Sequence, residues 1–340
     1  MNKRLKKIIE FLNRENLLTL LLIILVIVLC SSLAITYFEP DISFVSGIWW
    51  SIVTLTTVGY GDISPTSGGG RAVAAIIMFF GIGLLGMLSA QLATVMISKR
   101  MSENKGMGTV NLEEHVILCE WNHRSSAVLK EVRADRKTRK VPVVLIADID
   151  EKPVDDPLLI FVRGTVNEET LEKARLKNAA TVVILGDDNV DPTARDAKVV
   201  LTTLTVESIN PEVYTIVELV NKANEQHCRR ARADEIIVGS ELSSHLLATA
   251  AIDHGMSAIV SELLSTRYGN DLFSVAAPRK FVGRKYLEVM IALKQDHQAT
   301  LLGIQNKKEN RLLANPEMDY VIADEDYLVM ISRDRSLLPS

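Results

Sequence analysis

Residues 56–62 read Thr-Thr-Val-Gly-Tyr-Gly-Asp, and this stretch decides how the N-terminal part of the chain folds. Backbone carbonyls that all point at one axis require φ to alternate in sign along the chain. Glycine reaches positive φ at little steric cost, so Gly59 and Gly61 suit such a backbone. Carbonyls of residues 57–60, with the Thr57 hydroxyl below them, would offer rings of oxygen in place of the water shell of K⁺. The sequence therefore predicts a potassium selectivity filter made of Thr57, Val58, Gly59, Tyr60 and Gly61.

Two long apolar segments flank this loop. Residues 17–37 and 72–97 carry no charged side chain, and each is long enough to cross a hydrocarbon core of roughly 30 Å. A cleaved signal peptide is the alternative for the first segment, but its apolar run is longer than a typical signal core. Basic residues before the first segment and after the second place both ends in the cytoplasm. We therefore expect a multi-pass protein of the inner (plasma) membrane, with a cytoplasmic N-terminus over residues 1–16 and a pore domain over residues 17–98.

Residues 43–56 lie between the two spans and are too short to cross the membrane. They follow Pro40-Asp41 and predict a re-entrant pore helix. Irregular backbone at membrane depth is tolerated only inside protein or beside a water-filled pore, so the filter loop predicts a homotetramer surrounded by lipid. Trp49 and Trp50 are expected either to pack behind the filter or to form an interfacial aromatic belt. Asp62 is expected to hold the loop by hydrogen bonding or to attract cations.

The two spans, the pore helix and Thr-Val-Gly-Tyr-Gly-Asp together resemble the pore of two-helix potassium channels. In that family the inner helix often bends at a glycine, and Gly81 lies at the matching distance after the filter. The resemblance therefore implies a gating hinge at Gly81. A close contact between helices is the alternative, and Gly81, Gly83 or Gly86 would each allow it.

The remainder of the chain alternates between short apolar runs and amphipathic helical patterns. Residues 99–112 are polar and predict a linker. Strand and helix patterns over residues 113–256 predict an α/β Rossmann-like lobe with a parallel sheet, and residues 257–340 predict a small α+β lobe. The three cysteines are scattered without metal-binding spacing, so neither a disulfide framework nor a zinc site is expected. No nucleic-acid partner is expected.

A two-helix pore followed by these lobes resembles the prokaryotic potassium channels with an RCK domain (regulator of K⁺ conductance), of the MthK and GsuK type. The resemblance implies an octameric cytoplasmic gating ring that pulls on the inner helices when a ligand binds. Part of the ring is attached to the pore, and the rest would come from another chain or from separate soluble copies. Met101 and Met107 lie where an internal start would fall, although each is equally an ordinary linker residue.

A nucleotide, NAD or one of the ADP/ATP type, is one ligand that the Rossmann-like pattern indicates. The chain lacks all the glycines of Gly-x-Gly-x-x-Gly after the first strand. Other residues at the ends of the first three strands suit such a ligand: an arginine near a helix start for phosphate, acids for ribose and a tryptophan for stacking. The candidates are Trp121, Asn122, Arg124, Asp148, Asp150, Arg163 and Thr165. A degenerate lobe that serves only assembly is the alternative.

Calcium is the other ligand that the family resemblance implies. Some members bind Ca²⁺ through carboxylates at the ends of the fourth and fifth strands, and the matching residues here are Asp187 and Glu218. The second acid expected after Glu218 is replaced by Val220, so the pattern is incomplete. A membrane-anchored oxidoreductase is an alternative from another class, but the sequence offers no catalytic constellation and the chain is not expected to be an enzyme.

Overall fold

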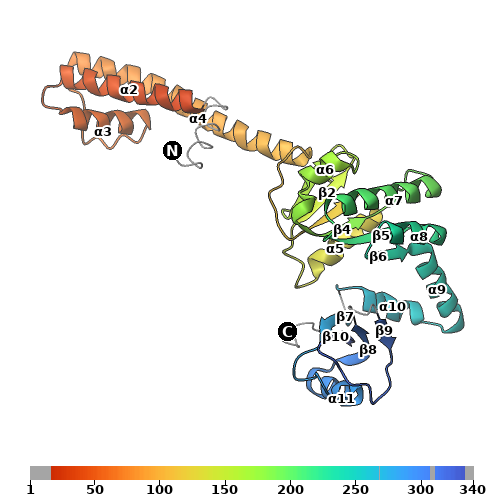
Figure 1. The fold of residues 1–340 in the computed structure, drawn as a ribbon. Coiled ribbons are helices and arrows are strands. Elements are labelled where there is room, and N and C mark those ends of the chain that lie inside the picture. The colour runs from red at the N-terminus through yellow and green to blue at the C-terminus, as the bar shows by residue number, and fades with distance from the viewer. Residues whose placement is uncertain (1–16, 268, 307–310, 334–340) are drawn as a thin grey trace. The chain divides into compact units, whose positions relative to one another are not determined.

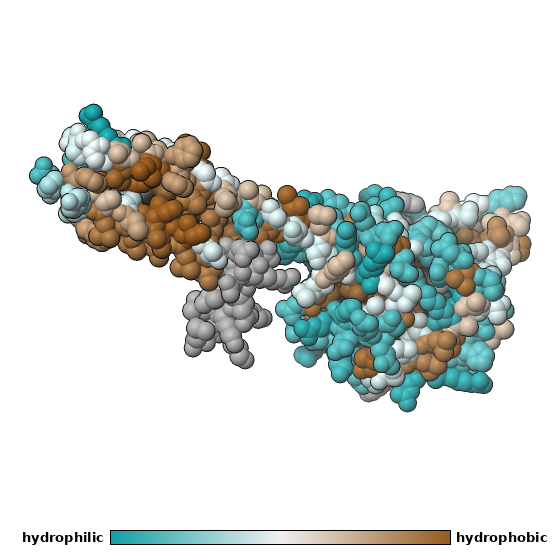
Figure 2. Space-filling model, turned by 90° about the horizontal axis from the view of Figure 1, so that it is seen from above, coloured by the Kyte–Doolittle hydropathy of each residue, from teal (hydrophilic) through white to brown (hydrophobic). Residues whose placement is uncertain are grey.

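The computed structural model describes residues 17–267, 269–306 and 311–333, and the predicted cytoplasmic N-terminus over residues 1–16 lies outside them. The chain forms two compact units, which divide between Asn104 and Lys105. The first unit is helical, and the second contains two β-sheets with their helices (Figure 1). Hydrophobic side chains cover much of the first unit, whereas the second has a mostly hydrophilic surface (Figure 2).

The described residues of the first unit, 17–104, form the helices α2 (Leu17–Phe38), α3 (Phe44–Leu55) and α4 (Gly68–Asn104). Helices α2 and α4 are long and apolar enough to cross a membrane, as predicted for residues 17–37 and 72–97. Helix α4 extends beyond the predicted span at both ends, because polar residues continue the helix past the apolar segment. Many apolar side chains on these helices are exposed in the single chain, which fits contact with lipid or with other subunits.

Helix α3 is the predicted re-entrant pore helix. Ser43 caps its N-terminus by accepting a hydrogen bond from the backbone N–H of Ser46. Gly47 lets it approach α2 closely, since a Cβ there would lie 2.8 Å from the Ser32 hydroxyl oxygen. Trp50 is buried in the apolar cluster that α3 shares with α2 and α4. These contacts fix where the loop after α3 begins.

Glu39 joins the end of α2 to the start of α4. Its Oε1 accepts hydrogen bonds from the backbone N–H groups of Thr66 and Ser67, at 2.8 and 2.7 Å, and its Oε2 accepts one from the Thr66 hydroxyl at 3.0 Å. The backbone hydrogen bond from Ser67 is the main reason that the pKa of Glu39 falls from its ordinary 4.5 to about 2. An ionised carboxylate therefore ties the segment before α4 to the outer end of α2.

The second unit begins with a six-stranded parallel sheet in the order β3-β2-β1-β4-β5-β6. Its strands are β1 (His115–Cys119), β2 (Val143–Ala147), β3 (Leu159–Arg163), β4 (Ala179–Ile184), β5 (Tyr214–Leu219) and β6 (Glu235–Val238). Its helices are α5 (His123–Ala134), α6 (Glu168–Lys173), α7 (Pro192–Ile209) and α8 (Glu225–Arg230), with short 3-10 turns η1 (Leu176–Asn178) and η2 (Lys222–Asn224). The strand order reverses between β1 and β4, so the predicted Rossmann-like lobe has its switch point there.

The buried apolar residues of this lobe divide into two clusters, one for each face of the sheet. Alternate residues of β1 belong to different clusters: Ile117 to one and Leu118 to the other. That division is typical of a parallel sheet covered by helices on both faces. The parallel sheet with intervening helices that the pattern over residues 113–256 predicts is present.

The chain continues through α9 (Gly239–Ile252) and α10 (Met256–Leu264) into a small antiparallel sheet with the order β7-β10-β8-β9. The elements of this α+β lobe are β7 (Asp271–Ala276), α11 (Tyr286–His297), β8 (Thr300–Asn306), β9 (Arg311–Ala314) and β10 (Asp326–Ser332). Helix α10 and the short β9 had not been predicted. Neither α9 nor α10 contains a buried residue, so their apolar side chains lack cover within one chain.

Replacing Glu39 with Gln should lower the melting temperature of the purified channel in a pH-dependent way. Because the pKa of this carboxyl is depressed, its stabilising effect is present above the ordinary value of 4.5 and is lost as the pH falls toward 2. The difference in melting temperature between wild type and Glu39→Gln should therefore shrink between pH 6 and pH 3. Asp41→Asn is the control for loss of charge nearby. A difference that stays constant over this pH range would contradict the role of the ionised carboxylate.

Candidate functional site

The loop after α3 has the alternating backbone that the sequence predicts. φ is positive at Gly59 (60°) and Gly61 (73°), and also at Thr57 (57°), which had not been anticipated. A β-branched residue rarely adopts positive φ, so the position is held by its surroundings. The backbone N–H of Thr57 donates to the Thr54 carbonyl at 3.0 Å, and that of Val58 donates to the Val53 carbonyl at 3.0 Å. The carboxyl end of the pore helix thus fixes the start of the loop.

Trp49 supports the same loop from the side. Its indole Nε1 donates a hydrogen bond to Asp62 Oδ2 at 2.8 Å. Its ring also stacks on that of Tyr60, with centroids 6.0 Å apart and an interplanar angle of 6°. Trp50 is buried among α2, α3 and α4. Of the two predicted roles for the tryptophans, packing around the filter loop is the one that the structure supports, and Asp62 holds the loop by hydrogen bonding.

Gly81 lies where α4 passes the end of the pore helix. A Cβ at this position would lie 2.8 Å from the carbonyl oxygen of Leu55, so glycine permits the two helices to touch. By contrast, a Cβ at Gly83 or Gly86 would meet no atom within 4 Å in the single chain. Helix α4 is continuous through Gly81. The close contact is therefore present at this residue, and the hinge stays a prediction.

The first turn of the Rossmann-like lobe forms without any of the expected glycines. Glu120, directly after β1, has φ of 71°, and its side chain pairs with Lys198 of α7 at 2.7 Å. Asn122 then caps α5, where its Oδ1 accepts hydrogen bonds from the backbone N–H groups of Arg124 and Ser125. The N–H groups at this helix start, which we had expected to meet a phosphate, are thus occupied by Asn122.

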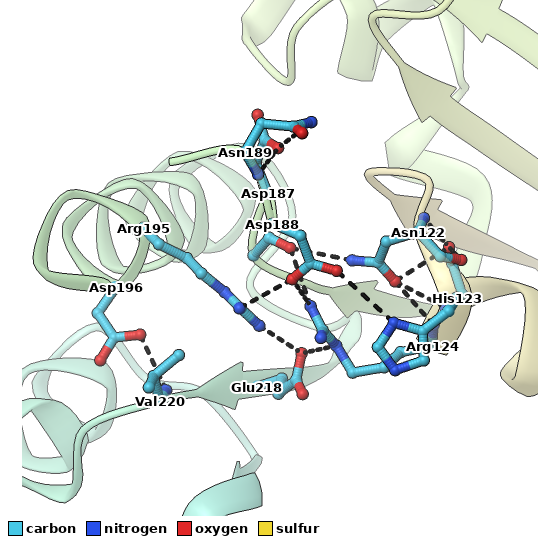
Figure 3. Close-up of polar contacts among 12 residues, drawn as sticks. Asn122, His123, Arg124, Asp187, Asp188, Asn189, Arg195, Asp196, Glu218 and Val220 are labelled. Atoms are coloured by element: carbon cyan, nitrogen blue, oxygen red, sulfur yellow. Dashed lines mark hydrogen bonds and ion pairs between the residues drawn. The ribbon is translucent and has the colours of Figure 1, made fainter. Parts of the chain in front are cut away.

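Four charged side chains meet at the switch point between β1 and β4 (Figure 3). Asp188 Oδ1 receives Arg124 Nη2 at 2.6 Å and Arg195 Nη1 at 2.9 Å. Glu218 Oε2, at the end of β5, lies 2.8 Å from Arg124 Nε and 3.3 Å from Arg195 Nη2. Arg124 and Arg195, which we call the arginine pair, therefore lie between two carboxylates.

Arg195 was missed in the sequence. Its position in the sequence could have identified it, because Arg195 lies in the first turn of α7, and the N-cap of that helix, Asp191, follows the end of β4. Gly186 leaves the space that Arg195 needs, because a Cβ there would lie 2.1 Å from Arg195 Nε. Burial opposes ionisation of Asp188, but the hydrogen bond from Arg124 and the charges of Arg124, Arg195 and His123 outweigh burial and lower the pKa of Asp188.

A second group of predicted residues meets at the ends of β2 and β3. Arg163 Nη2 pairs with Asp150 Oδ1 at 2.8 Å, and both side chains are largely exposed. Asp148 and Arg163 line an open cavity of about 700 Å³ whose other side is formed by linker residues 105–110. The backbone N–H of Arg163 donates to the Gly106 carbonyl at 3.3 Å. The linker that follows α4 in the chain thus contacts this part of the lobe.

The two remaining nucleotide candidates differ in their surroundings. Trp121 is half-buried and packs against the apolar cluster that contains Leu129 and Leu145. Thr165 is exposed, and its carbonyl accepts a hydrogen bond from the Thr170 hydroxyl. The structure therefore brings Asp148, Asp150 and Arg163 together, and separately Asn122 and Arg124. It gives Trp121 a packing role within the lobe.

The predicted calcium ligands are not assembled into a site. Among the residues that the structure describes, no three of His, Cys, Asp or Glu are gathered as metal ligands. Glu218 faces two guanidinium groups, and Asp187 Oδ1 accepts hydrogen bonds from Asn189 instead. Ca²⁺ requires several oxygen ligands. Arginines supply the positive charge beside Glu218 in this chain, and the calcium site at Asp187 and Glu218 stays a prediction.

Comparisons with known families match three consecutive segments of the chain. Residues 23–98 match the family described as "Ion channel". Residues 111–217 match "Calcium-activated potassium channel slowpoke-like RCK domain", and residues 240–338 match "Castor and Pollux, part of voltage-gated ion channel".

Relatives of known description align over most of the chain. The calcium-gated potassium channel TvoK of Thermoplasma volcanium is 29% identical over 86% of this chain and 83% of its own length. The putative potassium channel protein YugO of Bacillus subtilis is 29% identical over 91% of this chain and 94% of its own. These relatives are channels, as expected here, and not enzymes.

Solved structures also align with the chain, and the first of the two named here shares the fold of the part that it covers. The human SLO3 gating ring is 15% identical and covers 66% of this chain and 44% of its own, with a TM-score of 0.52. The GsuK channel bound to NAD is 18% identical, covers 96% of this chain and has a TM-score of 0.48; this chain spans 58% of its length. The chain therefore combines a segment that matches the ion-channel family with a segment that matches the RCK domain, and over most of its length it is similar to potassium channels.

Proposed function

We propose that this potassium channel is opened or closed by a nucleoside-phosphate ligand, NAD or an adenine nucleotide, that binds its RCK lobe. The lobe places charged residues that suit such a ligand at the ends of its strands. Its switch point holds the arginine pair, and its β2 and β3 ends hold Asp148 and Arg163 beside the linker that follows α4. Phosphate suits guanidinium groups, and ribose hydroxyls suit an acid at the end of the second strand.

K⁺ is the permeant ion, and residues 57–61 form its filter in a homotetramer. The alternating φ values at Thr57, Gly59 and Gly61 support this assignment. Four such loops around one axis would replace the hydration shell of K⁺ with carbonyl and hydroxyl oxygens. The stacking of Trp49 on Tyr60 and its hydrogen bond to Asp62 would hold the diameter of the ring.

Calcium is the competing ligand, because the relative TvoK is named as calcium-gated. In this chain the carboxylate of Glu218 is already neutralised by Arg124 and Arg195. Together with Asp188 the four side chains are neutral, so a divalent cation could bind Glu218 only by displacing both guanidinium groups, whereas guanidinium groups are themselves partners for phosphate. The charges therefore favour the nucleotide.

Coupling from lobe to pore would run through the linker. A ligand in the cavity beside Asp148 and Arg163 would touch residues 105–110 directly, and the linker is joined to α4 in the chain. A ligand shifts a gate only by its differential affinity for the open and closed states. We propose that α4 bends at a hinge at Gly81, where the helix contacts Leu55.

The lobes assemble with one another on the cytoplasmic side of the inner membrane. Leu247 and Ile252 of α9 and Leu264 of α10 are 71, 80 and 60% exposed, and a second lobe of the same kind would cover them. Together with the tetrameric pore, this assembly would give an octameric ring in which the lobes not attached to the pore come from another chain or from separate soluble copies. Light scattering and gel analysis of the purified channel test it. A tetramer without any shorter chain would exclude soluble lobes made from Met101 or Met107. A separate test labels a C-terminal tag from outside the cell. A tag that is accessible only from outside would exclude the cytoplasmic location.

Replacing Gly59 with Ala should abolish K⁺-selective current in planar bilayers. A Cβ meets no atom within 4 Å there, but φ is 60°, and a non-glycine residue in this region costs about 1–2 kcal/mol. The cost would be repeated in every subunit, so the filter backbone would rearrange. Unchanged selectivity for K⁺ over Na⁺ would contradict the assignment of the filter.

Replacing Gly81 with Ala should destabilise the pore and reduce the channel's response to ligand, since the added methyl group would press on the Leu55 carbonyl at about 1–3 kcal/mol. Gly83→Ala is the matched control in the same helix. Melting temperature and open probability of both variants are the measurements. If Gly81→Ala gates normally while Gly83→Ala does not, the hinge is placed at the wrong residue.

Replacing Asp148 with Ala should weaken NAD or ADP binding about tenfold or more in calorimetry, because a charged hydrogen bond to the ribose would be lost. Asp155→Ala removes an exposed acid from the same connection between β2 and β3 and serves as the control. Equal affinities of wild type and Asp148→Ala would exclude the ribose role. Binding of Ca²⁺ in place of nucleotide by the wild type would reverse the choice of ligand.

A further inference from the structure

The arginine pair at the switch point presents two guanidinium groups to a single carboxylate oxygen. Arg124 Nη2 and Arg195 Nη1 both contact Asp188 Oδ1, at 2.6 and 2.9 Å (Figure 3). The two arginines come from different helices, the starts of α5 and α7. Planar guanidinium groups of this kind bind carboxylate and phosphate alike. The arrangement is therefore a site for an anion that the chain fills with one of its own side chains.

The arginines are fixed from the opposite side by Glu218. Its side chain is 14% exposed, it lies within β5, and it contacts both Arg124 and Arg195. The side chain of Arg195 is only 12% exposed. Its Nε is buried and has no hydrogen-bond partner among the residues described. The arginine pair is thus held in place whether or not Asp188 is bound to it.

Asp188 is more exposed than Glu218 and does not belong to the sheet. It lies in the segment between β4 and α7, outside any strand or helix, and its side chain is 36% exposed. The two ends of that segment are fixed at buried Gly186 and at Asp191, which caps α7. Only the middle of the segment would have to move for Asp188 to leave the arginines.

We propose that Arg124 and Arg195 form a binding site for a phosphate group of the ligand, and that Asp188 occupies this site when ligand is absent. This inference rests on the proposed nucleotide function and adds to it the position of the phosphate and a competing side chain. With Glu218 in place and Asp188 displaced, the arginine pair keeps one excess positive charge. The terminal phosphate of ADP carries more negative charge than a carboxylate, and the pyrophosphate of NAD carries two charges over its two phosphates, so either ligand can compete with Asp188 for the arginine pair.

Competition by Asp188 has a measurable consequence. A ligand that binds only when Asp188 has moved away has its apparent affinity reduced by the fraction of molecules in that state. Neutralising Asp188 removes both the competitor and its repulsion toward the incoming anion. The affinity for phosphate should therefore rise when this acid is lost, which is the opposite of the effect expected for a residue that binds ligand.

The test measures pyrophosphate binding to the full-length channel in detergent by calorimetry. Asp188→Asn should bind pyrophosphate about tenfold more tightly than wild type, which corresponds to about 1.4 kcal/mol. Glu212→Gln removes an equal charge at the other end of β5 and should leave the affinity unchanged. Adding Arg195→Gln to Asp188→Asn should remove the gain. Melting curves establish that each variant is folded.

An Asp188→Asn channel that binds pyrophosphate no more tightly than wild type would overturn the inference. So would an equal gain in Glu212→Gln, since the effect would then come from net charge alone. ADP binding to the wild type separates this result from the proposed function. If ADP binds and depends on Asp148 while Asp188→Asn shows no gain, the nucleotide site stands and the phosphate position is wrong. If wild type binds no ADP and Asp188→Asn binds no pyrophosphate, both fail.

Discussion

A backbone that lies at membrane depth without helical hydrogen bonds must have its polar groups satisfied in another way. Residues 57–61 are such a backbone, and the rest of the pore unit follows from them. Positive φ at alternate residues suits carbonyls that serve an ion, so several chains must surround one axis. Helix α3 fixes the start of the loop, Trp49 and Asp62 hold its side, and α2 and α4 supply an exposed apolar surface.

In the second unit, which has a hydrophilic surface, charged side chains likewise have partners of opposite charge. The switch point of its parallel sheet gathers two arginines and two carboxylates into a neutral set. One carboxylate, Glu218, belongs to the sheet, and the other, Asp188, belongs to an exposed connection. A site balanced by one fixed and one movable anion can exchange the movable one. The cavity at the ends of β2 and β3 is lined on one side by linker residues 105–110. The proposed ligand site and the linker that would carry its effect to the pore therefore lie in the same lobe.

Much of this architecture could be predicted from the sequence because it depends on local patterns. Uncharged spans gave α2 and α4, and alternation of short apolar runs with amphipathic segments gave the parallel sheet. Two kinds of feature could not be predicted. Helix α10 is only nine residues long and β9 only four, so each offers few residues from which a periodicity can be recognised. The contacts of Arg195 with Asp188 and of Gly106 with Arg163 join residues far apart in sequence, and only the fold brings them together.

The central claim is that a nucleotide bound in the RCK lobe changes how often the pore conducts. Single-channel recording in planar bilayers, with NAD or ADP added to the cytoplasmic side at constant K⁺, tests it most directly. The account predicts that open probability changes with nucleotide concentration, whereas single-channel conductance, set by the filter, stays the same. An open probability that is indifferent to both nucleotides, in a channel that still conducts K⁺ selectively, would contradict it.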